Sequence, residues 1–240
     1  MNFRIVDLSQ EIYNGMPVYP GHQRTAIFPT KTHEESAIVF KNSPSGHSST
    51  ANTVIFSDHG PTHVDSFRHI DSRPDAQTID QIGIEWFFTE AICIDLSKFC
   101  GTDAWVGADE VETACKKSGL EVPEKGTVLV WTGHYDKYYG GDFGDWLYKY
   151  PGLNEEAMNW LADRGVINVG FDAPSIDSSR AMTEKAYWAH KVCRERKILN
   201  TENLANLKGV VGTKFIFSCL PLKIRNGTGS PVRAVAIYFD

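Results

Sequence analysis

Four side chains that can bind a divalent metal or move a proton lie within a short segment of the chain. The segment is SDHGPTHVDSFRHI, residues 57–70, and the four are His59, His63, Asp65 and His69. Imidazole nitrogen and carboxylate oxygen are usual protein ligands of Zn²⁺, Mn²⁺ and Fe²⁺. Two histidines and one aspartate leave coordination positions for water, whose pKa a metal can lower from about 16 to about 7. A further histidine can transfer a proton, since its pKa lies near neutral pH.

The spacing of these residues favours an extended backbone. All four positions are odd, and side chains of a strand alternate between its two faces, so a fully extended run would place the four on one face. A helix would align His59 with His63, and Asp65 with His69, but would not bring all four onto one stripe. Pro61 also disfavours a helix interior. We therefore expect a strand followed by an irregular loop, and we favour a metal site over four unrelated histidine and aspartate side chains.

A serine nucleophile is a weaker candidate. Asp172, Ser175 and Asp177 lie in the segment DAPSIDSS. No G-x-S-x-G turn surrounds Ser175. The segment is instead interpreted as the end of a strand and a loop near the site.

Two further candidates have stronger structural explanations. Cys193 follows His190 by three residues, so the two could share a helix face, but a buried thiol is the simpler interpretation. The region 131–148 is dense in aromatic residues and could line an apolar pocket, although core packing explains most such residues. His134 within it could contact a substrate.

Length and composition suit one soluble globular domain. The chain has 240 residues, which is consistent with a single domain over residues 1–240. The net charge of -6, without a basic stripe, argues against nucleic acid as a partner. We expect no signal peptide, no membrane-spanning helix and a cytoplasmic location. The five cysteines lack paired metal spacing, so we expect reduced thiols.

Strands and helices alternate through the middle of the sequence, with extra strands at both ends. This favours an α/β fold with a mixed β-sheet and flanking helices. Helices are predicted at 107–120, 153–166 and 183–196, with Asn154 as an N-cap and Gly165 near a C-cap. Strands are predicted at the following ranges: 3–9, 50–59, 87–97, 126–133, 167–175, 214–222 and 232–239.

The histidine segment also resembles the signature of the cyclase family of metal-dependent hydrolases, which looks like H-x-G-T-H-x-D-x-P-x-H. Here Gly60 and Pro61 depart from the usual x-Gly, and Phe67 replaces the usual proline. These departures alter the loop beside the metal without removing a ligand. Segments 7–21, 152–177 and 215–237 resemble the family as well, so the resemblance covers nearly the whole chain. It implies a single-domain, swivelling β/β/α fold.

The resemblance implies a metal-ligand set drawn from both halves of the chain. His59, His63 and Asp65 are similar to the family's ligands of a first metal. His190 and Glu202, the latter in a segment similar to I-x-x-x-E-x-L-x-N-L, would hold a second metal that Asp65 and Glu202 bridge to the first. The implied cofactor is Zn²⁺ or Mn²⁺, as one or two ions.

The resemblance implies hydrolysis of a small-molecule substrate. Metal-activated water would open a small cyclic or aryl amide, imide or lactone, as in enzymes of the arylformamidase or isatin hydrolase type, with His69 as the proton shuttle. A homodimer or homotetramer is also implied. Two alternatives stay open. One is a non-haem Fe²⁺ oxygenase that uses His63, Asp65 and His190 as ligands, with Arg194 or Arg196 binding a keto acid. The other is a catalytically silent metal-binding protein on the same scaffold.

Overall fold

A nine-stranded mixed sheet forms the centre of the molecule in the computed structural model, which describes residues 2–239. In spatial order its strands are β1 (Phe3–Asp7), β13 (Val235–Phe239), β11 (Lys214–Ser218), β5 (Phe88–Asp95), β7 (Thr127–Trp131), β9 (Asn168–Phe171), β10 (Leu199–Glu202), β4 (His63–Asp65) and β12 (Gly229–Pro231). The helices are α1 (His33–Val39), α2 (Phe67–Ile70), α3 (Ala108–Ser118), α4 (His134–Tyr138), α5 (Phe143–Tyr148), α6 (Glu155–Ala162), α7 (Ala181–Glu184) and α8 (Trp188–Arg196).

The middle of the sheet is parallel and the outer strands are antiparallel. Strands β5, β7, β9 and β10 run parallel to one another. Helices lie in the connections between them, as parallel pairing requires crossover connections. On the far side of β10, β4 and β12 pair antiparallel, and this brings residues 63–65 next to residues 200–202.

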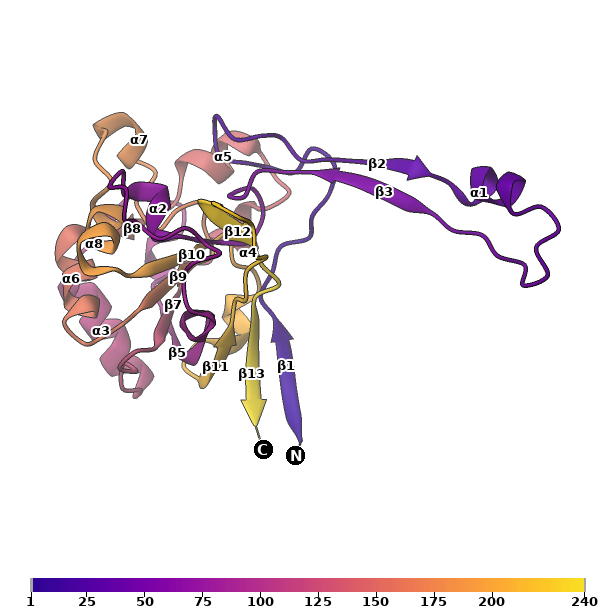
Figure 1. Cartoon of the computed structure of the whole chain (residues 1–240). Coiled ribbons are helices and arrows are strands. Elements are labelled where there is room, and N and C mark those ends of the chain that lie inside the picture. Colours follow the sequence, from indigo (N-terminus) through magenta and orange to yellow (C-terminus); the bar gives the residue numbers. More distant parts are fainter. Residues whose placement is uncertain (1, 240) are drawn as a thin grey trace.

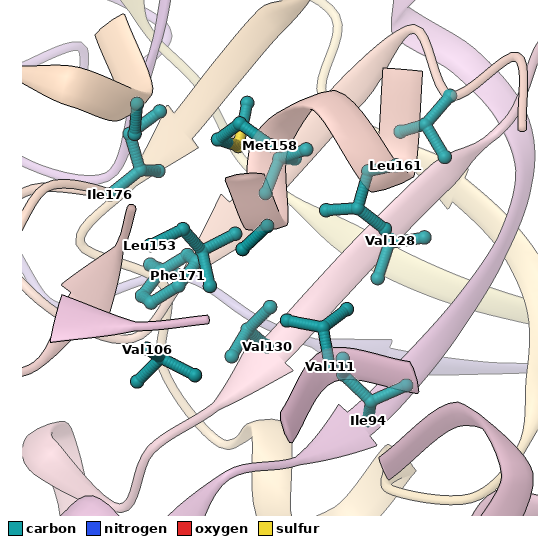
Figure 2. Packing of buried hydrophobic residues seen from close by; sticks show 14 of the residues in the cluster. Ile94, Val106, Val111, Val128, Val130, Leu153, Met158, Leu161, Phe171 and Ile176 are labelled. Carbon is teal, nitrogen blue, oxygen red and sulfur yellow. The ribbon is translucent and has the colours of Figure 1, made fainter. Parts of the chain in front are cut away.

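Two apolar cores lie on opposite faces of the sheet. On β5, Ile92 and Ile94 belong to the core under the helices, whereas Ala91 and Cys93 belong to the other core. This alternation follows from the period of two along a strand. Figure 2 shows Val111 of α3 and Met158 and Leu161 of α6 packed over strands β5 and β7. Helices α3, α6 and α8 therefore cover one face of the sheet (Figure 1).

A long arm extends from this body (Figure 1). It consists of β2 (Ala26–Lys31) and β3 (Ala51–Ile55), paired antiparallel, with α1 at its tip. A second small pair, β6 (Trp105–Val106) with β8 (Gly152–Leu153), lies in the body. Several large apolar side chains of the arm are exposed: Phe28, Ile38, Val39, Phe40, Val54 and Ile55.

The expected α/β fold with a mixed sheet and flanking helices is confirmed. Helix α3 ends at Gly119 in the left-handed conformation, and the Asn154 side chain caps α6 by accepting the Ala157 N–H at 2.9 Å. The single helix expected at 183–196 is wrong, because Lys185 adopts a left-handed conformation between α7 and α8. The strand expected at 50–59 belongs to the arm rather than to the central sheet.

The described residues include no helix that is both long and apolar enough to cross a membrane. All five cysteines are free.

Candidate metal centre

The candidate centre is built on β4, at the point where three strands lie side by side. His63 and Asp65 of β4 are two residues apart and fully enclosed by protein. Glu202 of β10 pairs with His63 in register, and Gly229 of β12 pairs with Asp65. Antiparallel neighbours place residue pairs about 5 Å apart, so this register brings donors from the two halves of the chain together.

One group of possible ligands consists of His59, Asp65 and His69, whose ligand atoms all lie within 4.8 Å of one another. His59 Nδ1 lies 2.7 Å from Asp65 Oδ1, and His69 Nε2 lies 3.7 Å from Asp65 Oδ2. The two imidazole rings face each other with centroids 4.0 Å apart. This group could hold one metal ion.

The second group consists of His63, Asp65 and Glu202, again within 4.8 Å of one another. His63 Nε2 lies 3.3 Å from Asp65 Oδ1 and 3.6 Å from Glu202 Oε2. His190 faces the same carboxylates, with its Nε2 3.6 Å from Asp65 Oδ2 and 3.6 Å from Glu202 Oε1. Six side chains singled out in the sequence therefore converge, and Asp65 belongs to both groups.

The local conformation differs from the extended run expected for residues 57–70. Only residues 63–65 form a strand; His59 lies in a turn and His69 in the short helix α2. Pro61 lies outside any helix, as expected. The donors converge because the chain folds back on both sides of β4, not because one flat strand presents them.

Asp177 holds His190 in place. Its Oδ2 accepts a hydrogen bond from the His190 ring at 2.5 Å, and its two oxygens accept the backbone N–H groups of Ala189 and His190 at 2.7 and 3.2 Å. These N–H groups belong to the first turn of α8, whose own N-cap residue makes no side-chain hydrogen bond. One buried carboxylate thus caps α8 and turns His190 Nε2 towards Asp65 and Glu202.

Residues at the beginning of β12 and just before it hold His59 in position. Its Nε2 lies 2.9 Å from Thr228 Oγ1, and that hydroxyl donates to Asp58 Oδ2 at 2.8 Å. Gly229 lies against the same ring, because a Cβ placed there would be only 2.6 Å from His59 Cε1. Glycine at this position therefore leaves the space that the His59 imidazole occupies.

The remaining donors are also oriented by hydrogen bonds. His63 Nδ1 lies 2.8 Å from the carbonyl oxygen of Pro61. The Asn200 amide donates to Asp65 Oδ2 at 2.9 Å and to Glu202 Oε1 at 3.1 Å. The carboxylates of Asp65 and Glu202 are thus held side by side, and both are buried.

The charges of the two carboxylates in the cluster favour the binding of a cation. Burial raises the pKa of Asp65, but the charges of His69 and His59 and a hydrogen bond with His190 outweigh it and hold that pKa well below its usual range. Burial and the adjacent charge of Asp65 raise the pKa of Glu202. Two buried carboxylates in contact repel each other, and a divalent cation would relieve this repulsion.

His69 stands apart from the other donors because it is partly open to solvent. Its side chain is 31 % exposed, whereas those of His63 and Asp65 are buried. Asp65 raises the pKa of His69, but burial and the charges of the neighbouring histidines lower it to about 4. The positive charges of the neighbouring histidines thus disfavour the protonated form of His69.

A pocket of about 410 Å³ opens above the cluster. Besides the donors it is lined by Tyr19 and His22 from the N-terminal loop and by Tyr187 at the start of α8. The Tyr19 and Tyr187 hydroxyl oxygens are 3.3 Å apart. Sequence reasoning missed these three residues, since no spacing pattern links residue 19 with residue 187.

Other sequence candidates lie elsewhere. Ser175 lines the pocket, but no histidine is hydrogen-bonded to its hydroxyl within residues 2–239. Cys193 is fully buried in the core under the helices, and burial raises its pKa well above the usual range. His134 is buried against Trp146, with ring centroids 4.8 Å apart, and does not line this pocket. No residue of 131–148 lines this pocket, and the packing of Trp146 and His134 agrees with the simpler interpretation.

A curled mixed sheet with a buried cluster of histidines and carboxylates at the floor of a pocket defines an α/β protein with a candidate metal site. The family described as "Putative cyclase" matches residues 6–178, and the chain belongs to this family. The resemblance seen in the sequence is therefore confirmed.

Curated relatives match over nearly their full length. Kynurenine formamidase of Bacillus anthracis is 26% identical over 230 residues, which is 96% of this chain and 95% of the relative. Kynurenine formamidase of Paracidovorax citrulli is 28% identical over 229 residues, 95% of this chain and 94% of the relative. These relatives are amide hydrolases by name.

Solved structures share the fold. Isatin hydrolase A from Labrenzia aggregata, bound to benzyl benzoate, has a TM-score of 0.82 at 23% identity and covers 99% of this chain and 94% of its own. An isatin hydrolase bound to the product analogue thioisatinate has a TM-score of 0.84 at 21% identity, covering 99% and 93%. A potential metal-dependent hydrolase with cyclase activity has a TM-score of 0.71 at 19% identity and covers both chains fully, 100% and 100%. The chain therefore has the cyclase-family hydrolase fold.

Proposed function

We propose that this protein is a metal-dependent hydrolase that opens a small cyclic or aryl amide, imide or lactone. The observation that carries the proposal is the convergence of His59, His63, His190 and Glu202 on the buried carboxylate of Asp65. Membership of the cyclase family and the amide-hydrolase names of its relatives support the C–N bond as the target.

The donor set suits a divalent ion. Imidazole and carboxylate donors without a thiolate suit Zn²⁺ or Mn²⁺ rather than a soft ion such as Cu⁺. By the family resemblance, His59, His63 and Asp65 would hold one ion, and Asp65, His190 and Glu202 a second. By distance alone the donors group instead as His59, Asp65 and His69, and as His63, Asp65 and Glu202. When bound, such an ion supplies Lewis acidity towards a carbonyl and lowers the pKa of water.

The protein's own residues would complete the chemistry. His69 is partly exposed and lies 3.7 Å from Asp65, where it would take a proton from water and return it to the leaving nitrogen or oxygen. The apolar side chains of Ile70 and Pro174 line the pocket and limit water around the substrate. A pocket of about 410 Å³ suits a substrate of one or two rings.

The oxygenase alternative uses only part of the cluster. A site of His63, Asp65 and His190 would leave His59, His69 and Glu202 without a role, although all three belong to the same cluster. Oxygen consumption that requires Fe²⁺ and 2-oxoglutarate would support the oxygenase, and hydrolysis under anaerobic conditions would exclude it.

The deciding experiment combines elemental analysis of purified protein with a hydrolysis screen. The panel contains formanilides, isatin-like lactams, cyclic imides and lactones, assayed without oxygen. We expect bound Zn²⁺ or Mn²⁺ and turnover of at least one amide, with loss of both on chelation. Full metal occupancy with no hydrolysis would instead identify a silent metal-binding protein.

We also propose a homodimer or homotetramer. The arm carries exposed apolar side chains, including Ile38 and Val39, and its tip extends away from the body (Figure 1). Large exposed apolar patches on soluble proteins often mark protein contacts. A second copy of the chain is the partner that would always be present.

A further inference from the structure

Two cationic side chains of the helix that supplies His190, Lys191 and Arg194, line the pocket. Arg194 follows His190 by one turn of α8, and both line the pocket. Side chains four residues apart share a helix face about 5 to 6 Å from each other. Arg194 is therefore placed to meet the far end of a molecule whose reacting group lies at the metal cluster.

The charge of Arg194 is weakly neutralised compared with that of its neighbours. Its ion pair within residues 2–239 is with Glu195, at 3.6 Å. Lys191 is bonded to Glu155 and Glu195 at 2.6 and 3.1 Å. Glu195 is thus already engaged, and the guanidinium of Arg194, 45 % exposed, keeps most of its hydrogen-bonding capacity.

The nearby Asp71 does not satisfy Arg194 either. Asp71 is held by Arg73 through both carboxylate oxygens. No salt bridge joins Asp71 to Arg194 in the described residues, although the charge of Arg194 contributes to lowering the pKa of Asp71. A free anion entering the pocket could therefore compete for Arg194 without breaking a strong internal pair.

We propose that Arg194 binds an anionic group of the substrate, a carboxylate or comparable oxyanion that lies away from the amide or lactone that reacts. This inference rests on the proposed function, because it deepens the substrate class of the same pocket. A planar guanidinium can donate two parallel hydrogen bonds to a carboxylate, which fixes orientation as well as charge. Arg194 is thus a specificity-determining residue.

The test compares matched substrates in matched variants. Formanilide is compared with formanilides that carry a carboxylate or a sulfonate on the ring or on a short side chain; sulfonate serves because it is a weak metal ligand. In Arg194→Gln we expect kcat/KM for the anionic substrates to fall about tenfold relative to kcat/KM for formanilide measured with the same variant. The control is Arg196→Gln, since Arg196 lies on the same helix but pairs with Asp163 at 2.8 Å outside the pocket.

A binding measurement separates this inference from the proposed function. An arylsulfonate without an amide is titrated into the purified protein by calorimetry, and we expect binding that weakens about tenfold in Arg194→Gln and not in Arg196→Gln. Arg194→Glu is expected to reverse the preference towards a substrate with an ammonium group. Equal losses for neutral and anionic molecules, or no loss for either, would overturn the role of Arg194. If no formanilide, lactam or lactone is hydrolysed while the arylsulfonate still binds through Arg194, only the proposed function fails.

Discussion

At the scale of single residues, three imidazoles of the cluster are oriented in the same way. Each has one ring nitrogen held by a neighbour: His63 by the Pro61 carbonyl, His190 by Asp177 and His59 by Thr228. The other nitrogen of each ring then faces the carboxylates. Such outer contacts fix the tautomer and orientation of a metal-binding histidine.

His69 lacks this second contact. Its ring makes no hydrogen bond within residues 2–239, and its closest charged partner is Asp65 at 3.7 Å. A ring without a hydrogen-bond partner keeps both of its nitrogens available for proton transfer. We predict that His69→Ala retains its metal but loses hydrolysis by about 10²- to 10⁴-fold. Metal content and turnover are measured on the same sample; loss of the metal would show that His69 is a ligand instead.

The role of Asp177 gives a second prediction at this scale. In Asp177→Asn one hydrogen-bond acceptor becomes a donor, so His190 loses its fixed orientation. We expect metal affinity to fall about 10- to 100-fold, measured by competition with a chromogenic chelator. Asp163→Asn, on the surface next to Arg196, is the control. Unchanged affinity alongside a lower melting temperature would mean that Asp177 serves only as the cap of α8.

At the scale of elements, the site depends on how strands β4, β10 and β12 fit together. Strand β12 passes close to the His59 ring only because residue 229 lacks a side chain. A strand that carried any larger residue there would push the ring aside. The packing of β12 thereby determines the position of the His59 ring.

Gly229→Ala tests this dependence. The added Cβ would lie 2.6 Å from His59 Cε1, so the ring must move, and we expect at least tenfold weaker metal binding. Gly209→Ala is a matched control, because a Cβ there meets nothing within 4 Å. Equal metal affinity in the two variants would contradict the proposed fit. Chelator competition gives the affinities, and thermal melting confirms that both variants fold.

Strands β7 and β9 are joined at their ends by Asp172. Its carboxylate accepts hydrogen bonds from Thr132 and Gly133, yet burial raises its pKa from 3.8 to about 6. Because the folded pKa is the higher one, this group contributes its full stability below about pH 4 and loses it as pH rises through about 6.

We therefore predict that the stability of the wild type relative to Asp172→Asn falls by about 3 kcal/mol between pH 4 and pH 7. The variant has no titrating group at this position, so other ionisable groups cancel in the difference. Urea unfolding at several pH values provides the free energies. A difference that does not depend on pH would show that Asp172 stays ionised throughout.

At the scale of the whole molecule, contacts with the body do not account for the stability of the arm. A two-stranded ribbon is marginally stable by itself, and Ile38 and Val39 at its tip are 76% and 77% exposed. A contact with another copy would bury these side chains and hold the ribbon in place.

We predict that replacing residues 26–55 by a short Gly–Ser linker converts a dimer or tetramer into a monomer. The double change of Ile38 and Val39 to serine should weaken assembly while the body stays folded. Light scattering after size exclusion gives the mass, and Phe143→Ser, at an exposed apolar site on the body, is the control. A wild-type monomer at micromolar concentration would refute the homo-oligomer.

The sequence by itself determined the donor types and their spacing in residues 57–70, because these follow from residue chemistry. Local periodicity and capping also predicted strands β1, β5, β7, β9, β11 and β13 and helices α3 and α6, but not β10, β12, α1, α2, α4 or α5. The family resemblance pointed to His190 and Glu202, but only the tertiary structure brought them to Asp65. That approach depends on β10 lying between β9 and β4, and strand order and register come from packing across the whole sheet rather than from any local pattern. For the same reason, only the tertiary structure showed that Asp177, Tyr19 and Arg194 lie at the site.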